Sequence, residues 1–460
     1  MSTRQEPAAS PPVGSRDDLD AWRAAGSKPA ERWRIGTEHE KFLFHVDTLQ
    51  PVTYAGPRGV RALMQSLIDR FGWLPVMEGD NIIALQRPGG EPGGTISLEP
   101  GGQFELSGEP LENVHQIAAE THTHLSQCLS VGSPLGIGFL GVGFAPHWTL
   151  AEMPRMPKER YGVMTRYMPK VGSRGLDMMY RTCTIQVNLD FADEADMVKK
   201  FRVSLALQPV ATAIFACSPF TEGKPSGFLS MRSEVWRDTD RRRTGMLPFV
   251  FEPGMGFERY ADYALDVPMY FVYRDGRYVD AAGASFRDFM AGKLAQLPGE
   301  RPTLDDWSDH LTTLFPEVRM KRFLEMRGAD GGRWRRICAL PAFWTGLLYD
   351  TASLDAAWDL VKDWTAADRQ ALRDAVPRTA LATPIRNTTV LEVARQTLAI
   401  AKSGLALRGR RDKQGRDESR FLEPVEAIVA QGCTPAEELL SRYENAWGKS
   451  TAPLFTEFSF

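Results

Sequence analysis

The sequence predicts an α+β fold in which a curved antiparallel sheet is flanked by helices and the C-terminal region is mostly helical. Polar and apolar residues alternate, as in strands with one buried face, over residues 34–44, 95–108, 181–191 and 322–330. Helical periodicity covers residues 60–71, 111–129 and 194–216, with strand-like segments dominating between. After Pro341 the periodicity predicts helices over residues 356–364, 366–375, 390–407 and 435–447. A chain of 460 residues, 43% of them hydrophobic, can bury one large core or two fused cores.

The first two predicted strands carry glutamates on one face. Successive side chains of a strand point to opposite faces, so Glu38 and Glu40 lie side by side. Like charges at this spacing repel, and their presence predicts a compensating cation, either an arginine or a bound metal ion such as Mg²⁺. In the second strand Glu105 shares a face with Gln103, and the preceding Pro-Gly-Gly bend lets Glu99 approach the same place.

The other two strands add amides and an arginine. Gln186 and Asn188 share one face of the third strand, and Glu325 shares a face of the fourth with Arg327. Each segment alone fits an ordinary antiparallel strand with one face in water. Together, their polar faces hold almost only Glu, Gln, Asn, Asp and Arg, which are hard oxygen ligands and anion-binding groups. The combined pattern favours a site for a metal ion and a phosphate group.

These residues resemble the metal-and-phosphate sheet of the glutamine synthetase superfamily. More closely, the chain resembles the plant-type glutamate–cysteine ligases, or γ-glutamylcysteine synthetases, of plants and proteobacteria. The resemblance covers about residues 20 to 448 and rests on runs far more specific than a four-residue motif. The runs are MPKERY at 156–161, GLDMM at 175–179, SPFTEGKP at 218–225, FLSMRS at 228–233 and ALPAFW at 339–344.

The resemblance implies a sheet of the glutamine-synthetase type and a carbon–nitrogen ligase. The implied reaction joins the γ-carboxylate of L-glutamate to the amine of L-cysteine through a γ-glutamyl phosphate, as the first step of glutathione biosynthesis. ATP is the implied co-substrate and Mg²⁺ the implied cofactor. Two alternatives stay open, because a fold does not fix a reaction: a γ-glutamyl ligase for another amine, and a small-molecule phosphotransferase on the same sheet.

The chemistry assigns roles to the polar residues. Phosphorylating a carboxylate places negative charge on phosphoryl oxygens, which positioned cations stabilise. The expected metal ligands are Glu38, Glu40, Glu99, Glu105 and Glu325. The expected catalytic residues are Arg327 and Arg232, and the expected substrate-binding residues are Arg181, Arg232, Gln186, Asn188 and Trp236. Arg232 could instead be a surface arginine. Arg241 and Arg243 are expected to bind nucleotide phosphates, although the mixed-charge run 237–245 equally fits a solvated loop.

Composition limits the partners and the boundaries. A net charge of −3 and a pI near 6.2 give no reason to expect a nucleic acid, and no apolar stretch reaches the length that spans a bilayer. We expect small-molecule partners and a monomer or homodimer. The expected boundaries are a disordered tail at 1–19, a catalytic domain at 20–448 and a C-terminal tail at 449–460. Residues 1–19 lack the apolar centre of a secretory signal and are short and acid-containing for a transit peptide, which favours a cytoplasmic protein.

The cysteines do not form a disulfide framework in the sequence pattern. There are five, an odd number, and none belongs to a CxxC pair. The resemblance adds that plant members carry two regulatory disulfides. At the positions that match the first of these disulfides, this chain has Ala118 and Cys338. At the positions that match the second, it has Ala281 and Gln296. We therefore expect neither bridge.

Overall fold

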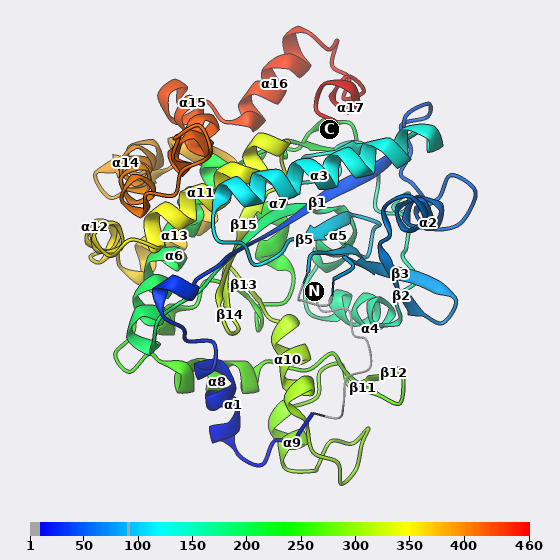
Figure 1. Cartoon of the computed structure of the whole chain (residues 1–460), viewed down its shortest axis with the longest axis vertical. Helices are drawn as coiled ribbons and strands as arrows, with labels where there is room; N and C mark the ends of the chain where they lie inside the picture. The colour runs from blue at the N-terminus through cyan, green and yellow to red at the C-terminus, as the bar shows by residue number, and fades with distance from the viewer. Residues whose placement is uncertain (1–9, 90–92) are drawn as a thin grey trace.

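The computed structural model describes residues 10–89 and 93–460 and confirms the α+β class (Figure 1). Its centre is a nine-stranded sheet in the order β14-β15-β7-β1-β5-β4-β3-β2, with β6 also paired to β1. Every one of these pairings is antiparallel. The strands are β1 Ile35–His45, β2 Leu74–Glu78, β3 Asn81–Gln86, β4 Thr95–Leu98, β5 Phe104–Ser107, β6 Ile137–Leu140, β7 Thr184–Leu189, β14 Val318–Met320 and β15 Leu324–Asp330.

Helices cover the sheet and extend beyond it. In the first half they are α1 Arg16–Ala24, α2 Val60–Phe71, α3 Val114–Gly132, α4 Glu159–Tyr167, α5 Gly175–Arg181, α6 Glu194–Ile214 and α7 Met231–Val235. In the second half they are α8 Phe257–Asp266, α9 Phe286–Met290, α10 Leu304–Thr312, α11 Trp334–Leu348, α12 Thr351–Val361, α13 Ala366–Thr379, α14 Val390–Arg408, α15 Glu423–Gln431, α16 Pro435–Asn445 and α17 Leu454–Glu457.

The strand register places the polar residues in rows across the sheet. Glu40 lies opposite Glu105, and Glu38 lies between Ser107 and Gln186. The next row runs from Gly36 through Asn188 and Glu325 to Arg319. Gly36 leaves room for Asn188, because an added Cβ would lie 3.1 Å from the Asn188 Cβ. The alternation that predicted separate strands therefore produces one continuous polar surface.

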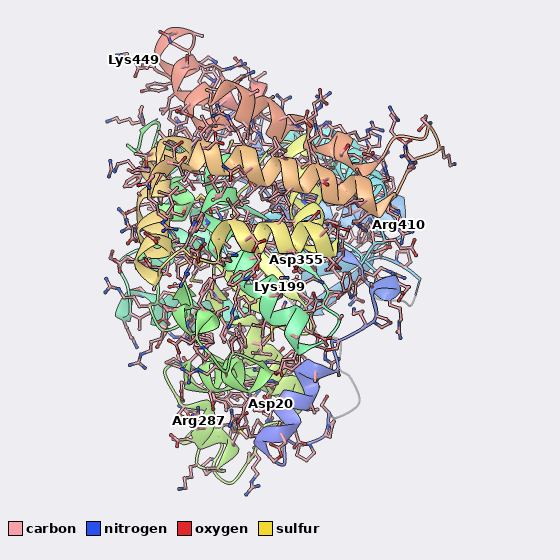
Figure 2. All side chains as sticks on the ribbon, turned by 90° about the vertical axis from the view of Figure 1, so that its left-hand side faces the viewer. Asp20, Lys199, Arg287, Asp355, Arg410 and Lys449 are labelled. Atoms are coloured by element: carbon pink, nitrogen blue, oxygen red, sulfur yellow. The ribbon has the colours of Figure 1, made fainter. Side chains whose placement is uncertain are left out.

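The two faces of β1 have different environments. On the face opposite the glutamates, His39 contacts His124 of α3, with 5.5 Å between ring centroids, and α11 packs beside α3 against β1 and β7. The glutamate face is surrounded by α4, α5 and α7. Two hydrophobic cores flank the sheet, one around α6, α11 and α14 and the other around α2, α4 and α5. In Figure 2, Lys199 of α6 lies beside Asp355 of α12, an ion pair that joins the outer helices.

Several segments differ from the sequence prediction. Helices α8, α9 and α10 occupy a region where strand-like patterns were expected to dominate. Helix α14 packs against α11 and ends at Arg408, one residue beyond its predicted end. Gly404 explains this packing, because an added Cβ would lie 1.9 Å from the Gly346 carbonyl oxygen of α11. Only a glycine lets these two helices approach so closely.

The expected tails also differ from the structure. Residues 1–9 lie outside the described part of the chain, but α1 begins at Arg16, inside the segment expected to be disordered. Leu19 of α1 is buried, and the Arg23 guanidinium lies 4.6 Å from the centroid of the Trp307 ring. At the other end Phe458 is buried, and the Phe460 amide donates to the Phe139 carbonyl at 3.0 Å. Within the described residues, no helix has the length and apolar character needed to cross a membrane.

Candidate active site

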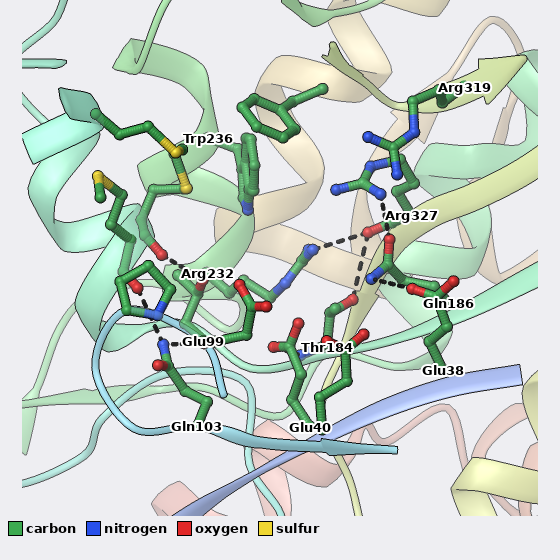
Figure 3. Close-up of a pocket in the computed structure, with 17 residues that line it drawn as sticks. Glu38, Glu40, Glu99, Gln103, Thr184, Gln186, Arg232, Trp236, Arg319 and Arg327 are labelled. Atoms are coloured by element: carbon green, nitrogen blue, oxygen red, sulfur yellow. Dashed lines mark hydrogen bonds between the residues drawn. The ribbon is translucent and has the colours of Figure 1, made fainter. Parts of the chain in front are cut away.

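One pocket brings together residues from all four predicted polar strands or their ends (Figure 3). Its floor is formed by carboxylates from β1, β5 and the bend before β5, namely Glu38, Glu40, Glu99 and Glu105. Its cationic wall consists of Arg232, Arg319 and Arg327. Gln103, Thr184 and Gln186 add neutral polar groups, and Trp236 and Phe315 add aromatic ones. We call these four glutamates the floor carboxylates.

The floor carboxylates form no direct ion pairs with described residues, and Glu105 differs from the other three because its pKa is lowered despite burial, in part by the hydrogen bond from Ser97. Three of them are buried and Glu40 is partly exposed, and among the described residues none of the four forms an ion pair. Burial raises the pKa of Glu40 well above its usual value, and the charges of Glu105 and Glu99 raise it further. Burial and then Glu105 raise the pKa of Glu99 to about 7. The site therefore gains stability from an added cation.

Neutral donors orient these carboxylates. Glu38 accepts from Asn188 Nδ2 at 3.0 Å and from Gln186 Nε2 at 3.3 Å. Ser97 Oγ donates to Glu105 at 2.7 Å, and the Thr184 amide donates to Glu40 at 2.9 Å. These bonds fix the oxygens without neutralising their charge. Within the described residues, however, no group of three His, Cys, Asp or Glu side chains is gathered closely enough to hold a metal ion.

Glu325 differs from the floor carboxylates, which corrects its predicted place among the metal ligands. It is fully buried and does not line the pocket. Arg319 binds both of its oxygens, at 2.8 and 3.0 Å, Lys321 approaches to 3.3 Å, and Arg327 also contacts it. Burial alone would raise the pKa of Glu325, but the charges of Arg319, Lys321 and Arg327 hold that pKa well below its usual value. Glu325 therefore organises the cationic wall.

Arg232 is a buried cation of the pocket, not a surface arginine. Its side chain is 4% exposed, and its Nη2 donates to the Arg327 carbonyl at 2.8 Å. Its Nε has no hydrogen-bond partner within the described chain. The hydroxyl of Ser230 caps α7, and Ser218 Oγ accepts from the Arg232 amide at 3.2 Å. Both serines donate to Asp330, so a buried carboxylate fixes the helix that carries Arg232.

Two other predicted residues, Arg181 and Asn188, do not line the pocket. Arg181 binds Asp177 at 3.1 Å and Glu222 at 3.2 Å, so its charge is already compensated. It does not line the pocket, and the prediction that it binds substrate is therefore wrong. Asn188 does not line the pocket either and acts on Glu38. Trp236, in contrast, lines the pocket, and its indole Nε1 is buried without a hydrogen-bond partner in the described residues.

The two arginines predicted to bind nucleotide phosphates, Arg241 and Arg243, have different environments in the structure. Arg243 is fully buried, where it donates to Asp240 at 2.6 Å and to the carbonyls of Thr313 and Pro268 at 3.0 and 2.7 Å. It is a structural residue, and its predicted nucleotide contact is wrong. Arg241 is exposed and lines a second, polar pocket beside Trp236.

Sequence reasoning missed Arg319 and undervalued Gln103. Arg319 could have been found from the apolar alternation at residues 318–326, which predicts a hairpin that sets it opposite Glu325. Gln103 accepts from the Gly101 amide at 2.9 Å and donates to the carbonyls of Met179 and Thr182 at 3.2 and 2.9 Å. It thereby ties the bend that carries Glu99 to α5. A single buried amide has no such signature in a sequence.

A sequence model of the glutamate–cysteine ligase family 2 (GCS2) matches residues 34–457. The chain belongs to this family. It is 57% identical to glutamate–cysteine ligase B, chloroplastic, of Oryza sativa subsp. japonica over 98% of this chain and 90% of that one. It is 58% identical to glutamate–cysteine ligase, chloroplastic, of Brassica juncea over 98% and 87%. These matches confirm the resemblance found in the sequence.

A solved structure shows the same fold at low identity. Glutamate–cysteine ligase of Francisella tularensis in complex with AMP matches with a TM-score of 0.54, over 93% of this chain and 89% of that one, at 10% identity. This likeness supports the expected sheet of the glutamine-synthetase type. The relatives also bring a correction: they are named as chloroplastic proteins, which contradicts the cytoplasmic location expected for this chain.

All five cysteines are free thiols in the structure. Four are buried and Cys433 is partly buried. Cys338 lies on α11, close to Thr121 of α3. Helix α3 also carries Ala118. The five free thiols agree with the expectation that neither disulfide forms in this chain.

Proposed function

We propose that this protein is an ATP-dependent glutamate–cysteine ligase. It joins the γ-carboxylate of L-glutamate to the amine of L-cysteine through a γ-glutamyl phosphate, with release of ADP and phosphate, as the first step of glutathione biosynthesis. The names of the relatives and the AMP in the structural neighbour support this assignment. The observation that carries it is the pocket itself, in which the four floor carboxylates share one cavity with Arg232, Arg319 and Arg327.

Both steps of the reaction transfer negative charge to phosphoryl oxygens. The γ-carboxylate attacks the γ-phosphorus of ATP and ADP leaves; the amine then attacks the acyl carbon and phosphate leaves. Guanidinium groups donate paired hydrogen bonds to such oxygens. We assign Arg327 to the transferring phosphoryl group, because Gln186 and Glu325 already hold its side chain at the pocket wall. Preorganised donors of this kind are effective because they need no reorganisation during the reaction.

Arg232 suits the α-carboxylate of a substrate or the phosphoryl group. It is a buried cation without a carboxylate partner in hydrogen-bond contact among the described residues, and its free Nε is a second donor. Trp236 offers its unpaired indole N–H to the same cavity. Gln186 contacts both Glu38 and Arg327, so it links the floor carboxylates to the cationic wall. Arg241 stays a candidate for the nucleotide phosphates in the neighbouring polar pocket.

Mg²⁺ is the cation that the floor carboxylates are suited to hold. Their ligand atoms are hard carboxylate oxygens. Burial, and then neighbouring carboxylates, raise the pKa values of Glu38, Glu40 and Glu99, so a bound cation would stabilise their charged forms. When bound, Mg²⁺ would neutralise charge on the phosphates of ATP. The lack of a preformed cluster of three ligands in the described residues agrees with this ion, which commonly uses one or two carboxylates together with substrate phosphates and water.

A single assay separates the proposed ligase from its alternatives. Release of ADP is measured with ATP, Mg²⁺ and glutamate, with and without cysteine, and the amide product is followed by mass spectrometry. A ligase forms γ-glutamylcysteine in step with ADP. Release of ADP without any amide would favour a phosphotransferase, and an amide formed only with another amine would favour a different γ-glutamyl ligase. The oligomeric state, monomer or homodimer, stays a prediction.

A further inference from the structure

The pocket has a third wall that is apolar and rich in sulfur. It consists of Met164 from α4 and the adjacent Met178 and Met179 from α5, and we call it the methionine wall. The three side chains are 5%, 7% and 2% exposed. In Figure 3 the sulfur atoms gather on the side of the cavity away from Arg319 and Arg327. The pocket therefore has thioether groups on one side and guanidinium groups on the other.

Hydrogen bonds hold the methionine wall in place. The Met178 carbonyl accepts from Thr182 Oγ1 at 2.7 Å, and the Met179 carbonyl accepts from Gln103 Nε2 at 3.2 Å. Gln103 lies between Glu99 and Glu105 in the chain, so one bend connects the floor carboxylates with the methionine wall. Gly101 permits this close approach, because an added Cβ would lie 2.3 Å from the Tyr180 carbonyl oxygen. Both backbone carbonyls beside the wall already have donors.

We propose that the methionine wall receives the thiol side chain of the acceptor amino acid and selects it against a hydroxyl. This inference rests on the proposed ligase activity. A thiol is a weak hydrogen-bond donor and loses little when it leaves water, and thioethers are soft, polarisable neighbours for it. A serine hydroxyl would lose its bonds to water in front of three thioethers. The same geometry leaves the amine and carboxylate of the acceptor on the side of the guanidinium groups.

The size of the discrimination follows from the chemistry. An apolar pocket rejects an isostere that carries a hydroxyl by only about 10²-fold in kcat/KM. We therefore expect L-serine to be used roughly 10²-fold less efficiently than L-cysteine, and L-2-aminobutyrate, whose methyl group replaces the thiol, to fall within about 10-fold of cysteine. Efficient use of serine combined with rejection of 2-aminobutyrate would overturn the proposal, because it would show hydrogen-bond recognition of the side chain.

Two variants test the wall directly. Met178→Gln and Met179→Gln keep the length of the side chain but add donors and acceptors, so each should reduce the preference for cysteine over serine by at least about 10-fold. Met153→Gln is the matched control, since Met153 is 6% exposed but does not line the pocket. It introduces a similarly buried amide and should leave the cysteine-to-serine ratio unchanged, and the melting temperature of all three variants reports folding.

The outcomes distinguish this proposal from the assignment of activity. If the wild-type chain makes γ-glutamylcysteine but both pocket variants keep the wild-type ratio, the methionine wall is not the thiol site. A change of the ratio in Met153→Gln as large as in the pocket variants would overturn the proposal in the same way. If the wild-type chain forms no amide with cysteine, the ligase assignment itself fails. A ratio measured on each purified variant cancels a loss of folded protein, because both substrates meet the same enzyme.

Discussion

Two floor carboxylates, Glu40 and Glu99, differ from Glu325 in their electrostatics. Glu40 and Glu99 lie among other carboxylates, and the pKa of each is raised by burial and by neighbouring glutamates. Glu325 is fully buried, yet three cations hold its pKa well below the usual value. The difference arises from register, since Glu40 lies opposite Glu105 whereas Glu325 lies opposite Arg319. Residue type and strand alternation alone cannot distinguish a glutamate that binds a metal ion from one that pairs with an arginine.

The same substitution should therefore have different consequences in the two places. The largest effect is expected for Glu40→Gln, which removes a floor carboxylate. Turnover should fall by at least roughly 10³-fold, the upper end of what loss of one electrostatic contact costs. The free energy of unfolding without metal should stay unchanged or rise by up to about 1 kcal/mol, because a like-charge pair is removed. Turnover at the wild-type rate would contradict the assignment, and partial rescue by high Mg²⁺ would locate the loss in affinity.

Glu325→Gln, in contrast, should lower the free energy of unfolding. Removing the carboxylate leaves Arg319, Lys321 and Arg327 as buried charges without their common partner. We expect a loss of about 3–5 kcal/mol in the free energy of unfolding, which is typical when one member of a buried ion-pair cluster is removed. Urea denaturation of this variant beside Glu40→Gln measures the contrast. Equal free energies of unfolding of the two variants would contradict the claim that Glu325 stabilises the cationic wall whereas Glu40 does not stabilise the metal-free fold.

Arg327→Lys tests the cationic wall in the reaction. A lysine keeps the charge but not the two-pronged geometry, so kcat should fall by roughly 10²-fold with a smaller change in the KM for glutamate. This split is expected when an interaction forms chiefly in the transition state. If only the KM for glutamate rises, Arg327 binds the substrate carboxylate, and the phosphoryl role passes to Arg232 or Arg319.

The pH dependence of stability should separate the two regions with a smaller effect. For Glu99 the folded pKa of about 7 lies above the ordinary value of 4.5, so the folded state holds the proton longer. The stability of the metal-free protein should then decline by about 1–3 kcal/mol between about pH 4.5 and about pH 7. Glu325 acts in the opposite sense: its contribution is present above 4.5 and is lost as the pH falls below that value. Urea denaturation from about pH 3 to about pH 7, with and without Mg²⁺, checks both signs, and a metal-free profile that rises from pH 4.5 to 7 would contradict the first.

Local patterns predicted much of the fold but not the partners of each charge. Helix α2 matches its predicted span of residues 60–71, and α14 differs from its prediction only at the C-terminal end. The alternating strands also placed Glu38, Glu40, Glu99 and Glu105 in one pocket. The roles of Arg181 and Arg243 were missed although each has a carboxylate partner within four residues, Asp177 and Asp240. Their other partners, Glu222 and Thr313, lie far away in the sequence and could not be predicted from it. Short helices such as α9 were missed because five residues are too few to establish a period.

Direct metal binding tests the central claim that the floor carboxylates form the metal site. Mn²⁺ can replace Mg²⁺ and be counted by electron paramagnetic resonance in the presence of a non-hydrolysable ATP analogue. Glu40→Gln should weaken Mn²⁺ binding by at least about 10-fold. Glu258→Gln, at a side chain that is 73% exposed and does not line the pocket, should bind Mn²⁺ like the wild type. Equal Mn²⁺ affinity of Glu40→Gln and wild type would contradict the account.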